Sequence, residues 1–171
     1  MPRDPMSVSD DVALPFFKTF AELEAALKQH ARFLKDKGNG PTPALINWKT
    51  VGLAAADLRP LTLKERLSPE TQRRILDDPA RNRPRRQEVE GDGATKRAVF
   101  TDHALPANEA AALVEAAQRV RNNLFHGSKE ECWTDSPDDD EPFVKAAHEI
   151  ATVLLELTRN HDLPNARPGN P

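Results

Sequence analysis

Several features that mark whole classes of proteins are scarce or absent in this sequence. It has one cysteine, Cys132, and no tyrosine. A single cysteine excludes an internal disulfide bond and any metal site made of several cysteines. No apolar run approaches the roughly 18 residues that a membrane-spanning helix needs, and the opening residues MPRDPMSVSDD lack the apolar segment of a secretory signal. We therefore expect a cytoplasmic protein without a membrane segment, and no metal ion or other cofactor.

A strong excess of positive charge is also missing. The 171 residues include 24 basic and 27 acidic side chains, which gives a formal net charge of −3. This balance excludes a protein that adheres to nucleic acid through its overall charge, but a nuclease site needs only a few local cations. The basic stretch 81–86 and the acidic stretch 135–141 are interpreted as solvated loops.

Hydrophobic periodicity predicts an all-α fold, an antiparallel bundle of four to five helices. The polar, proline-bearing ends 1–13 and 161–171 are expected to be disordered tails around one helical domain over 14–160. The expected helices cover residues 15–37, 43–58, 69–78, 108–126 and 142–160. Between the third and fourth helices, a short hairpin is predicted within 86–101.

Capping residues support two of the expected helix starts and one helix end. Ser68 followed by Pro69 is typical of a helix start. Asn108 is placed as the N-cap of the fourth helix, and Gly127 is placed to stop that helix after His126. The fourth helix is therefore bounded at both ends by local signals.

Two arginines of the fourth helix have different predicted environments. At about 100° per residue, Arg121 falls near the middle of the apolar stripe that includes Leu113, Ala117 and Leu124. Arg119 falls on the opposite, polar face. A guanidinium on a core-facing stripe is costly unless it is paired or lies at an interface or cleft. Arg121 is therefore the residue that needs an explanation.

Arg121 and His126 together offer the chemistry of RNA cleavage without a metal. A histidine titrates near neutrality and acts as general base or acid, and an arginine binds a phosphate and stabilises its developing charge. RNA supplies its own nucleophile, the 2′-hydroxyl, and Asn122 is placed to hydrogen-bond the ribose or to orient its neighbours. On an ideal helix the two side chains point about 140° apart. The site therefore needs either an unwound last turn or a second copy of the helix across a twofold axis.

The string VRNNLFHG, which contains these residues at the end of an amphipathic helix, resembles the active-site motif of the HEPN family (higher eukaryotes and prokaryotes nucleotide-binding domain). In that family an arginine is followed directly by a polar residue and, a few positions later, by a histidine. Arg97 and His103 have a similar spacing but lack the polar residue after the arginine. The resemblance extends loosely over the helical region 14–160.

The resemblance implies a metal-independent endoribonuclease that works as a homodimer, with a composite site at the dimer interface. Arg121, Asn122 and His126 would be its catalytic residues, and RNA or a nucleotide its substrate. A toxin or a phage-defence effector is the implied setting, with an antitoxin or a regulatory protein as a further partner. Some family toxins carry a tyrosine two positions after the histidine, where an antitoxin modifies it. Ser128 stands there in this chain, so regulation by that route is not expected.

Basic residues outside the motif are candidates for contacts with the substrate. Lys129 follows the motif closely and is expected to contact phosphate, although a solvated lysine is the simpler interpretation. Arg85 and Arg86 belong to the basic stretch 81–86, which is a candidate surface for the approach of RNA.

Three alternative hypotheses remain open at this stage. In the first, Arg121 forms a buried structural pair with a carboxylate such as Glu115 or Glu149, and His126 caps helix carbonyls. In the second, the segment belongs to a non-catalytic HEPN-like module that dimerises and binds a protein or nucleotide partner. A plain helical scaffold with a chance motif is a third, weaker interpretation.

Overall fold

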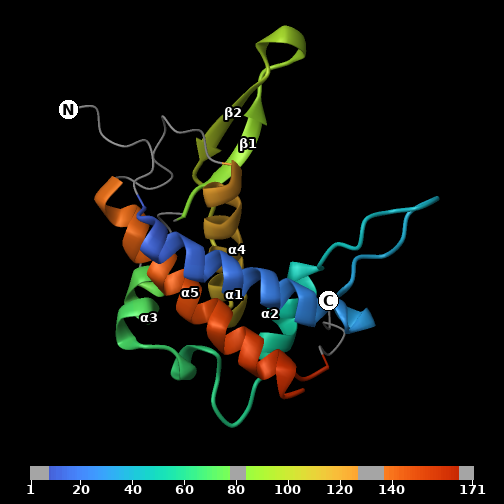
Figure 1. Ribbon diagram of the computed structural model, residues 1–171, viewed down its shortest axis with the longest axis vertical. Coiled ribbons are helices and arrows are strands. Elements are labelled where there is room, and N and C mark those ends of the chain that lie inside the picture. Colours follow the sequence, from blue (N-terminus) through green and yellow to red (C-terminus); the bar gives the residue numbers. More distant parts are fainter. Residues whose placement is uncertain (1–7, 78–83, 127–136, 166–171) are drawn as a thin grey trace.

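The described part of the chain, residues 8–77, 84–126 and 137–165 of a computed structural model, contains five α-helices, one β-hairpin and short 3-10 turns (Figure 1). The side chains at 126 and 137–139 lie outside that part as well. The helices are α1 (Asp10–Lys28), α2 (Trp48–Ala56), α3 (Pro69–Leu76), α4 (Glu109–His126) and α5 (Pro137–Arg159). The predicted, mainly helical class is confirmed.

The predicted hairpin is present and stands away from the helices (Figure 1). Strand β1 (Arg86–Glu90) pairs antiparallel with β2 (Arg97–Thr101), and Glu88 lies opposite Val99. Gly91 has a φ of +84° in the connection, a conformation that glycine adopts at little cost. Local turn signals were therefore sufficient to find this element.

The core lies between α1, α4 and α5. Helix α1 turns its apolar stripe inward, so that Phe16, Leu23 and Leu27 are completely buried. It packs mainly against α5, whose Ile150 and Leu154 are equally buried. A row of this kind at helical spacing is what drives a helix onto its neighbours.

The predicted antiparallel arrangement is wrong for α1 and α5, which run in the same direction. Contacts between them advance together along both helices: Ser9 meets Glu141, Thr19 meets His148, and the ring of His30 lies 5.6 Å from that of His161. The chain reaches α5 only after passing through α2, α3 and α4, and these return it to the end at which α1 begins. Helix periodicity carries no information about such a return.

Helix α1 begins and ends earlier than the sequence predicted. It starts at Asp10, inside the expected tail 1–13, and ends at Lys28 rather than near residue 37. Beyond it the chain turns, because Phe33 O accepts a hydrogen bond from Asn47 N (2.7 Å) and Leu34 forms a bridge with Ile46. Pairing between distant segments therefore overrides the helical pattern that continues to Leu34.

The other boundaries follow local capping more closely. Ser68 Oγ accepts a hydrogen bond from Thr71 N (3.3 Å), and Asn108 Oδ1 accepts one from Ala111 N (3.0 Å), so both predicted N-caps are confirmed. Helix α2 is shorter than the expected 43–58, and α5 begins at residue 137, ahead of the expected start at 142. No helix within the described ranges is long and apolar enough to cross a membrane.

A carboxylate on α5 holds the start of α3. Glu149 accepts hydrogen bonds from Ser68 N (2.6 Å), Ser68 Oγ (2.7 Å) and Thr71 Oγ1. Burial acts to raise the pKa of Glu149, but these hydrogen bonds outweigh it and leave the pKa below its ordinary value. This contact couples two helices that are far apart in the sequence.

Candidate functional site

Helix α4 carries the motif in its last turns, and its two arginines lie in environments opposite to those predicted. The side chain of Arg119 is 4% exposed, whereas that of Arg121 is 27% exposed. The prediction failed because α4 is covered on two sides, and small side chains opposite the apolar stripe form a second buried face. The buried residues of α4 are Ala110, Ala112, Leu113, Val114, Ala116, Ala117, Arg119, Val120 and Asn123.

Helix α2 provides the cover on this second face. Gly52 of α2 approaches so closely that a Cβ at this position would lie 3.3 Å from the Cα of Ala111. A glycine inside a helix is often explained by such a close approach. The sequence therefore contained a signal for this contact, although apolar periodicity alone could not assign it to a partner.

Arg119 is saturated with hydrogen bonds at the base of the hairpin. Its Nη1 donates to Pro84 O (3.2 Å) and His103 O (2.7 Å), and its Nη2 donates to Ala104 O (3.2 Å). Its Nε (3.1 Å) and Nη2 (2.5 Å) also donate to Glu115 Oε1. These bonds occupy all of the N–H groups that a guanidinium has. Arg119 therefore fastens both ends of the hairpin segment to α4.

Arg85 and Arg86, the predicted contacts to substrate, take part in the same junction. Arg85 Nε lies 2.9 Å from Asp102 Oδ1, and its carbonyl accepts a hydrogen bond from the buried Asn123 (2.9 Å). Arg86 Nη2 lies 2.9 Å from Glu115 Oε1. Both arginines are paired, and their arrangement primarily joins the hairpin to the helix.

Arg121 lies on the open edge of α4 and is oriented by its neighbours. Its Nη1 donates a hydrogen bond to Asn122 Oδ1 (3.0 Å), and its Nη2 is 3.5 Å from Glu24 Oε1 of α1. Its guanidinium carbon lies 4.8 Å from the ring centre of Phe125 and 6.0 Å from that of Phe20. Among the described residues, the bond to Asn122 is the one hydrogen bond that Arg121 donates. Apart from the ion pair with Glu24, its remaining N–H groups meet no acceptor within this part of the chain, and a guanidinium in this state suits a phosphate.

The carboxylates proposed as structural partners of Arg121 are engaged elsewhere. Glu115 accepts hydrogen bonds from Arg119 and Arg86 on the far side of α4. Glu149 accepts its hydrogen bonds at the start of α3. Neither of these carboxylates bridges to Arg121, but the expected kind of pair is present, with Glu24 as the partner.

His126 is the last residue of α4, but its side chain lies outside the described residues. Lys129 lies outside them too. Of the predicted catalytic residues, the structure brings Arg121 and Asn122 into direct contact. The relation of both to the imidazole therefore remains a prediction from the sequence.

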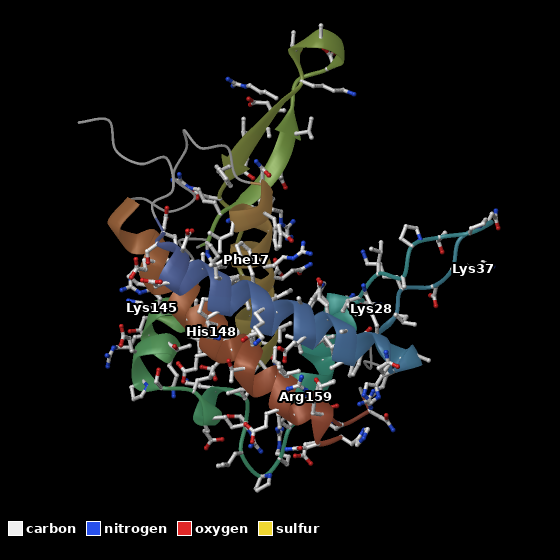
Figure 2. The ribbon with its side chains drawn as sticks, viewed as in Figure 1. Phe17, Lys28, Lys37, Lys145, His148 and Arg159 are labelled. Carbon is white, nitrogen blue, oxygen red and sulfur yellow. The ribbon has the colours of Figure 1, made fainter. Side chains whose placement is uncertain are left out.

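An apolar surface adjoins Arg121 where Phe17 of α1 (Figure 2) meets Phe125 of α4. The ring centres of Phe17 and Phe125 are 4.4 Å apart, and Phe125 is nevertheless 56% exposed. Leu14, one turn before Phe17 on α1, is 61% exposed. We call Leu14, Phe17, Arg121 and Phe125 the α1–α4 face. Large apolar side chains that gather around a cation mark a candidate interaction surface.

A hollow of about 770 Å³ opens on the other flank of α4, between α2 and the base of the hairpin; we call it the α2–α4 hollow. Asn122 and Arg86, two of the predicted site residues, both line it. The remaining lining residues are Trp48, Lys49, Gly52, Leu53, Gln87, Pro106, Asn108, Ala111, Glu115, Gln118 and Arg119. The sequence did not predict this hollow, because its walls come from three segments that are far apart in the chain.

A second, more polar hollow of about 630 Å³ lies where α1 and α5 end, beside His30 and His161. Arg32 also lines it and donates a hydrogen bond to Leu163 O (2.7 Å), which holds part of the expected tail 161–171 against the helices. Within the described ranges, no group of three or more histidine, cysteine or acidic side chains is placed to hold a metal ion. The two imidazoles therefore have no third ligand of that kind.

His148 is half-buried between α5 and α1 (Figure 2) and belongs to neither hollow. A hydrogen bond of 3.0 Å joins its Nε2 to Thr19 Oγ1. Burial lowers the pKa of His148 below its ordinary value. This histidine therefore contributes to packing between the two parallel helices.

No family model, no curated protein and no solved structure matches this chain. The motif residues, the helices around them and the two surfaces that flank α4 are therefore the features that point to a function.

Proposed function

We propose that this protein is a HEPN-like, metal-independent endoribonuclease that acts as a homodimer, with a composite site around Arg121, Asn122 and His126. The observation that carries the proposal is the state of Arg121. Its guanidinium is held by Asn122 and by two aromatic rings, while most of its N–H groups have no acceptor among the described residues. A cation that is positioned in advance, and paired at 3.5 Å with the carboxylate of Glu24, can still turn toward a charge that develops during a reaction.

The proposed reaction divides the work between the arginine and the histidine. The 2′-hydroxyl of the RNA attacks the adjacent phosphorus atom while an imidazole removes its proton. The bond from phosphorus to the 5′-oxygen breaks, and that oxygen leaves with a proton from an imidazolium. The products are a 2′,3′-cyclic phosphate and a 5′-hydroxyl. Arg121 would bind the non-bridging oxygens, and Asn122 would fix Arg121 and donate from its amide nitrogen to the ribose.

The α1–α4 face supports the dimer in this proposal. It exposes Leu14 and Phe125 beside Arg121, so a second copy placed on it would bury apolar surface and close the site against water. A twofold axis there would bring two copies of α4 together. The histidine of one copy would then lie near the arginine of the other, and the angular separation within one helix would no longer matter.

The second candidate is a non-catalytic HEPN-like module that dimerises or binds a protein or nucleotide partner. The exposed Phe125, which packs on the partly buried Phe17, favours it, because such a surface serves binding whether or not chemistry takes place. In the first candidate the biological setting would be a toxin or a phage-defence effector, controlled by an antitoxin or a regulatory protein. That setting follows from the resemblance alone.

A cleavage assay with a labelled, structured RNA in excess chelator tests the proposal. We expect cleavage that resists the chelator, yields 2′,3′-cyclic phosphate ends and is lost in Arg121→Ala and His126→Ala proteins. Arg159→Ala is the matched control, because Arg159 (Figure 2) is an exposed arginine at the end of α5 and pairs with Glu22 of α1. Cleavage at equal rates by all three variants would assign the activity to a contaminant or to another site and would overturn the proposal.

A further inference from the structure

The shape and lining of the α2–α4 hollow are those of a binding site rather than of a packing defect. Its floor is formed where Gly52 meets Ala111, and the small size of both residues lets the surface sink between the helices. Trp48 and Leu53 of α2 form one apolar wall, and Leu53 is an exposed leucine in that position. A flat aromatic ring beside an aliphatic side chain suits a flat, weakly polar ligand.

Polar groups surround this apolar floor. The amide of Gln118 lines the hollow from α4 and makes no hydrogen bond with other described side chains or backbone. Asn122 adds a second amide, whose oxygen is used by Arg121 and whose nitrogen meets no acceptor in the part of the chain that the structure describes. Lys49, on the rim, is exposed and forms no ion pair within the described ranges. The hollow thus combines an apolar slot, amides suited to the edge of a base and a nearby cation.

Asn122 also connects the hollow to the proposed reaction centre. Its side chain lines the hollow and, at the same time, accepts the hydrogen bond of Arg121. Asn122 thus lies between the hollow and Arg121, so groups attached to a flat ring in the hollow would extend past Asn122 toward Arg121. In a nucleotide those groups are the ribose and the phosphate.

We propose that the α2–α4 hollow binds one nucleobase of the RNA, next to the phosphate that is cleaved. The inference rests on the proposed function, because it places the base relative to Arg121. Stacking on the indole of Trp48 provides most of the binding, and the amides of Gln118 and Asn122 contact the edge of the base. A purine binds more tightly than a pyrimidine, because it covers more of the indole and of Leu53.

Trp48 provides a direct probe of this binding. The chain has two tryptophans, Trp48 and Trp133, so the Trp133→Phe protein reports on Trp48 alone. We expect adenosine monophosphate to quench this fluorescence with a saturable curve, uridine monophosphate to bind several times more weakly, and ribose 5-phosphate to have no effect. Equal quenching by ribose 5-phosphate, or no saturable quenching by adenosine monophosphate, would overturn the inference.

Variants within the hollow locate the binding. In the Trp133→Phe background, Leu53→Ala and Gln118→Ala should each weaken the binding of adenosine monophosphate about fivefold. Leu61→Ala is the control, because Leu61 is a similarly exposed leucine that does not line the hollow. Gln118 is a polar residue on the rim, so its loss leaves the fold intact. Unchanged affinity in both hollow variants would place the nucleotide elsewhere and refute the inference.

The same experiments separate this inference from the proposed function. His126→Ala, added to the Trp133→Phe protein, should bind adenosine monophosphate with unchanged affinity, because the hollow does not need the imidazole. Quenching that depends on Leu53 and Gln118, in a protein that cleaves no RNA, would support the base site and refute the ribonuclease. Cleavage that depends on His126 and is unchanged by Leu53→Ala and Gln118→Ala would support the ribonuclease and refute the base site.

Discussion

The two sides of α4 use an arginine in contrasting ways. On the hairpin side, Arg119 is buried and every N–H group meets a carbonyl or the carboxylate of Glu115. On the α1 side, Arg121 is partly exposed and donates one hydrogen bond within the described residues, to Asn122. A saturated guanidinium holds the fold together and has nothing left for a ligand. A guanidinium that is oriented but makes few hydrogen bonds contributes little to stability and remains available for chemistry.

The largest effect on stability should come from removing the hydrogen bonds of Arg119 on the hairpin side of α4. Arg119→Met leaves Glu115 without its closest partner and removes donors from the carbonyls of Pro84, His103 and Ala104. We expect the free energy of unfolding in urea to fall by about 3–5 kcal/mol. Arg159→Met, an exposed control, should change it by less than about 0.5 kcal/mol. A loss below about 1 kcal/mol for Arg119→Met would contradict the role assigned to this cluster.

A smaller loss of stability is expected when Glu149 is replaced. This carboxylate is a second charged group with several hydrogen bonds, and it holds the start of α3. Glu149→Gln weakens the hydrogen bonds from Ser68 and Thr71 and should lower the free energy of unfolding by about 2 kcal/mol at pH 7. The pKa of Glu149 is lower in the folded protein than its ordinary value of 4.5. Its contribution is therefore complete above that value and is lost as the pH falls through the folded pKa. Urea titrations between pH 7 and pH 3 should show the two proteins converging.

A substitution on the α1–α4 face should weaken association of the dimer and leave the stability of the monomer nearly unchanged. Phe125→Ser changes a side chain that is already more than half exposed, so unfolding of the monomer should change by less than about 1 kcal/mol. The dissociation constant of the dimer, measured by sedimentation equilibrium, should rise about tenfold. Leu45→Ser, at an exposed leucine outside the α1–α4 face, is the control. A dimer of unchanged affinity would move the interface away from this face.

The smallest effect is a pH dependence from His148. Burial lowers its pKa from 6.5, so the unfolded chain binds the proton more readily than the folded protein. The contribution of the neutral imidazole is therefore present above pH 6.5 and decreases as the pH falls through the folded pKa. His148→Gln should flatten stability between pH 7.5 and 5.5, as measured by thermal unfolding. An equally steep dependence in the variant would assign it to another group.

Local signals in the sequence were sufficient for part of the fold. The N-caps Ser68 and Asn108 and the hairpin within 86–101 depend on residues a few positions apart, and all three were predicted correctly. The end of α1 was predicted wrongly, because the path of the chain beyond it depends on pairing between Leu34 and Ile46. Neighbours in the chain determine a cap, whereas distant segments determine where a helix must stop.

In the candidate site, too, the features that depend on contacts between distant segments were not predicted. Arg121 was singled out as a charge on an apolar stripe, and it lies at the edge of that stripe, beside Glu24. Arg119 was assigned to solvent because its acceptors, the carbonyls of residues 84, 103 and 104, come from a segment that periodicity could not place. The α2–α4 hollow escaped prediction for a similar reason. Gly52 was its one signal in the sequence.

Matched substitutions of the two arginines test most directly whether the open side of α4 carries the function. Cleavage of RNA in chelator and unfolding in urea would be measured on Arg119→Met and Arg121→Met, with cleavage rates compared per folded molecule. We predict that Arg121→Met keeps its stability within about 1 kcal/mol and loses cleavage by at least about a hundredfold. Arg119→Met should lose stability and, where folded, keep its cleavage rate within about tenfold of the wild-type rate. Wild-type cleavage by Arg121→Met, or loss of its fold, would contradict the account.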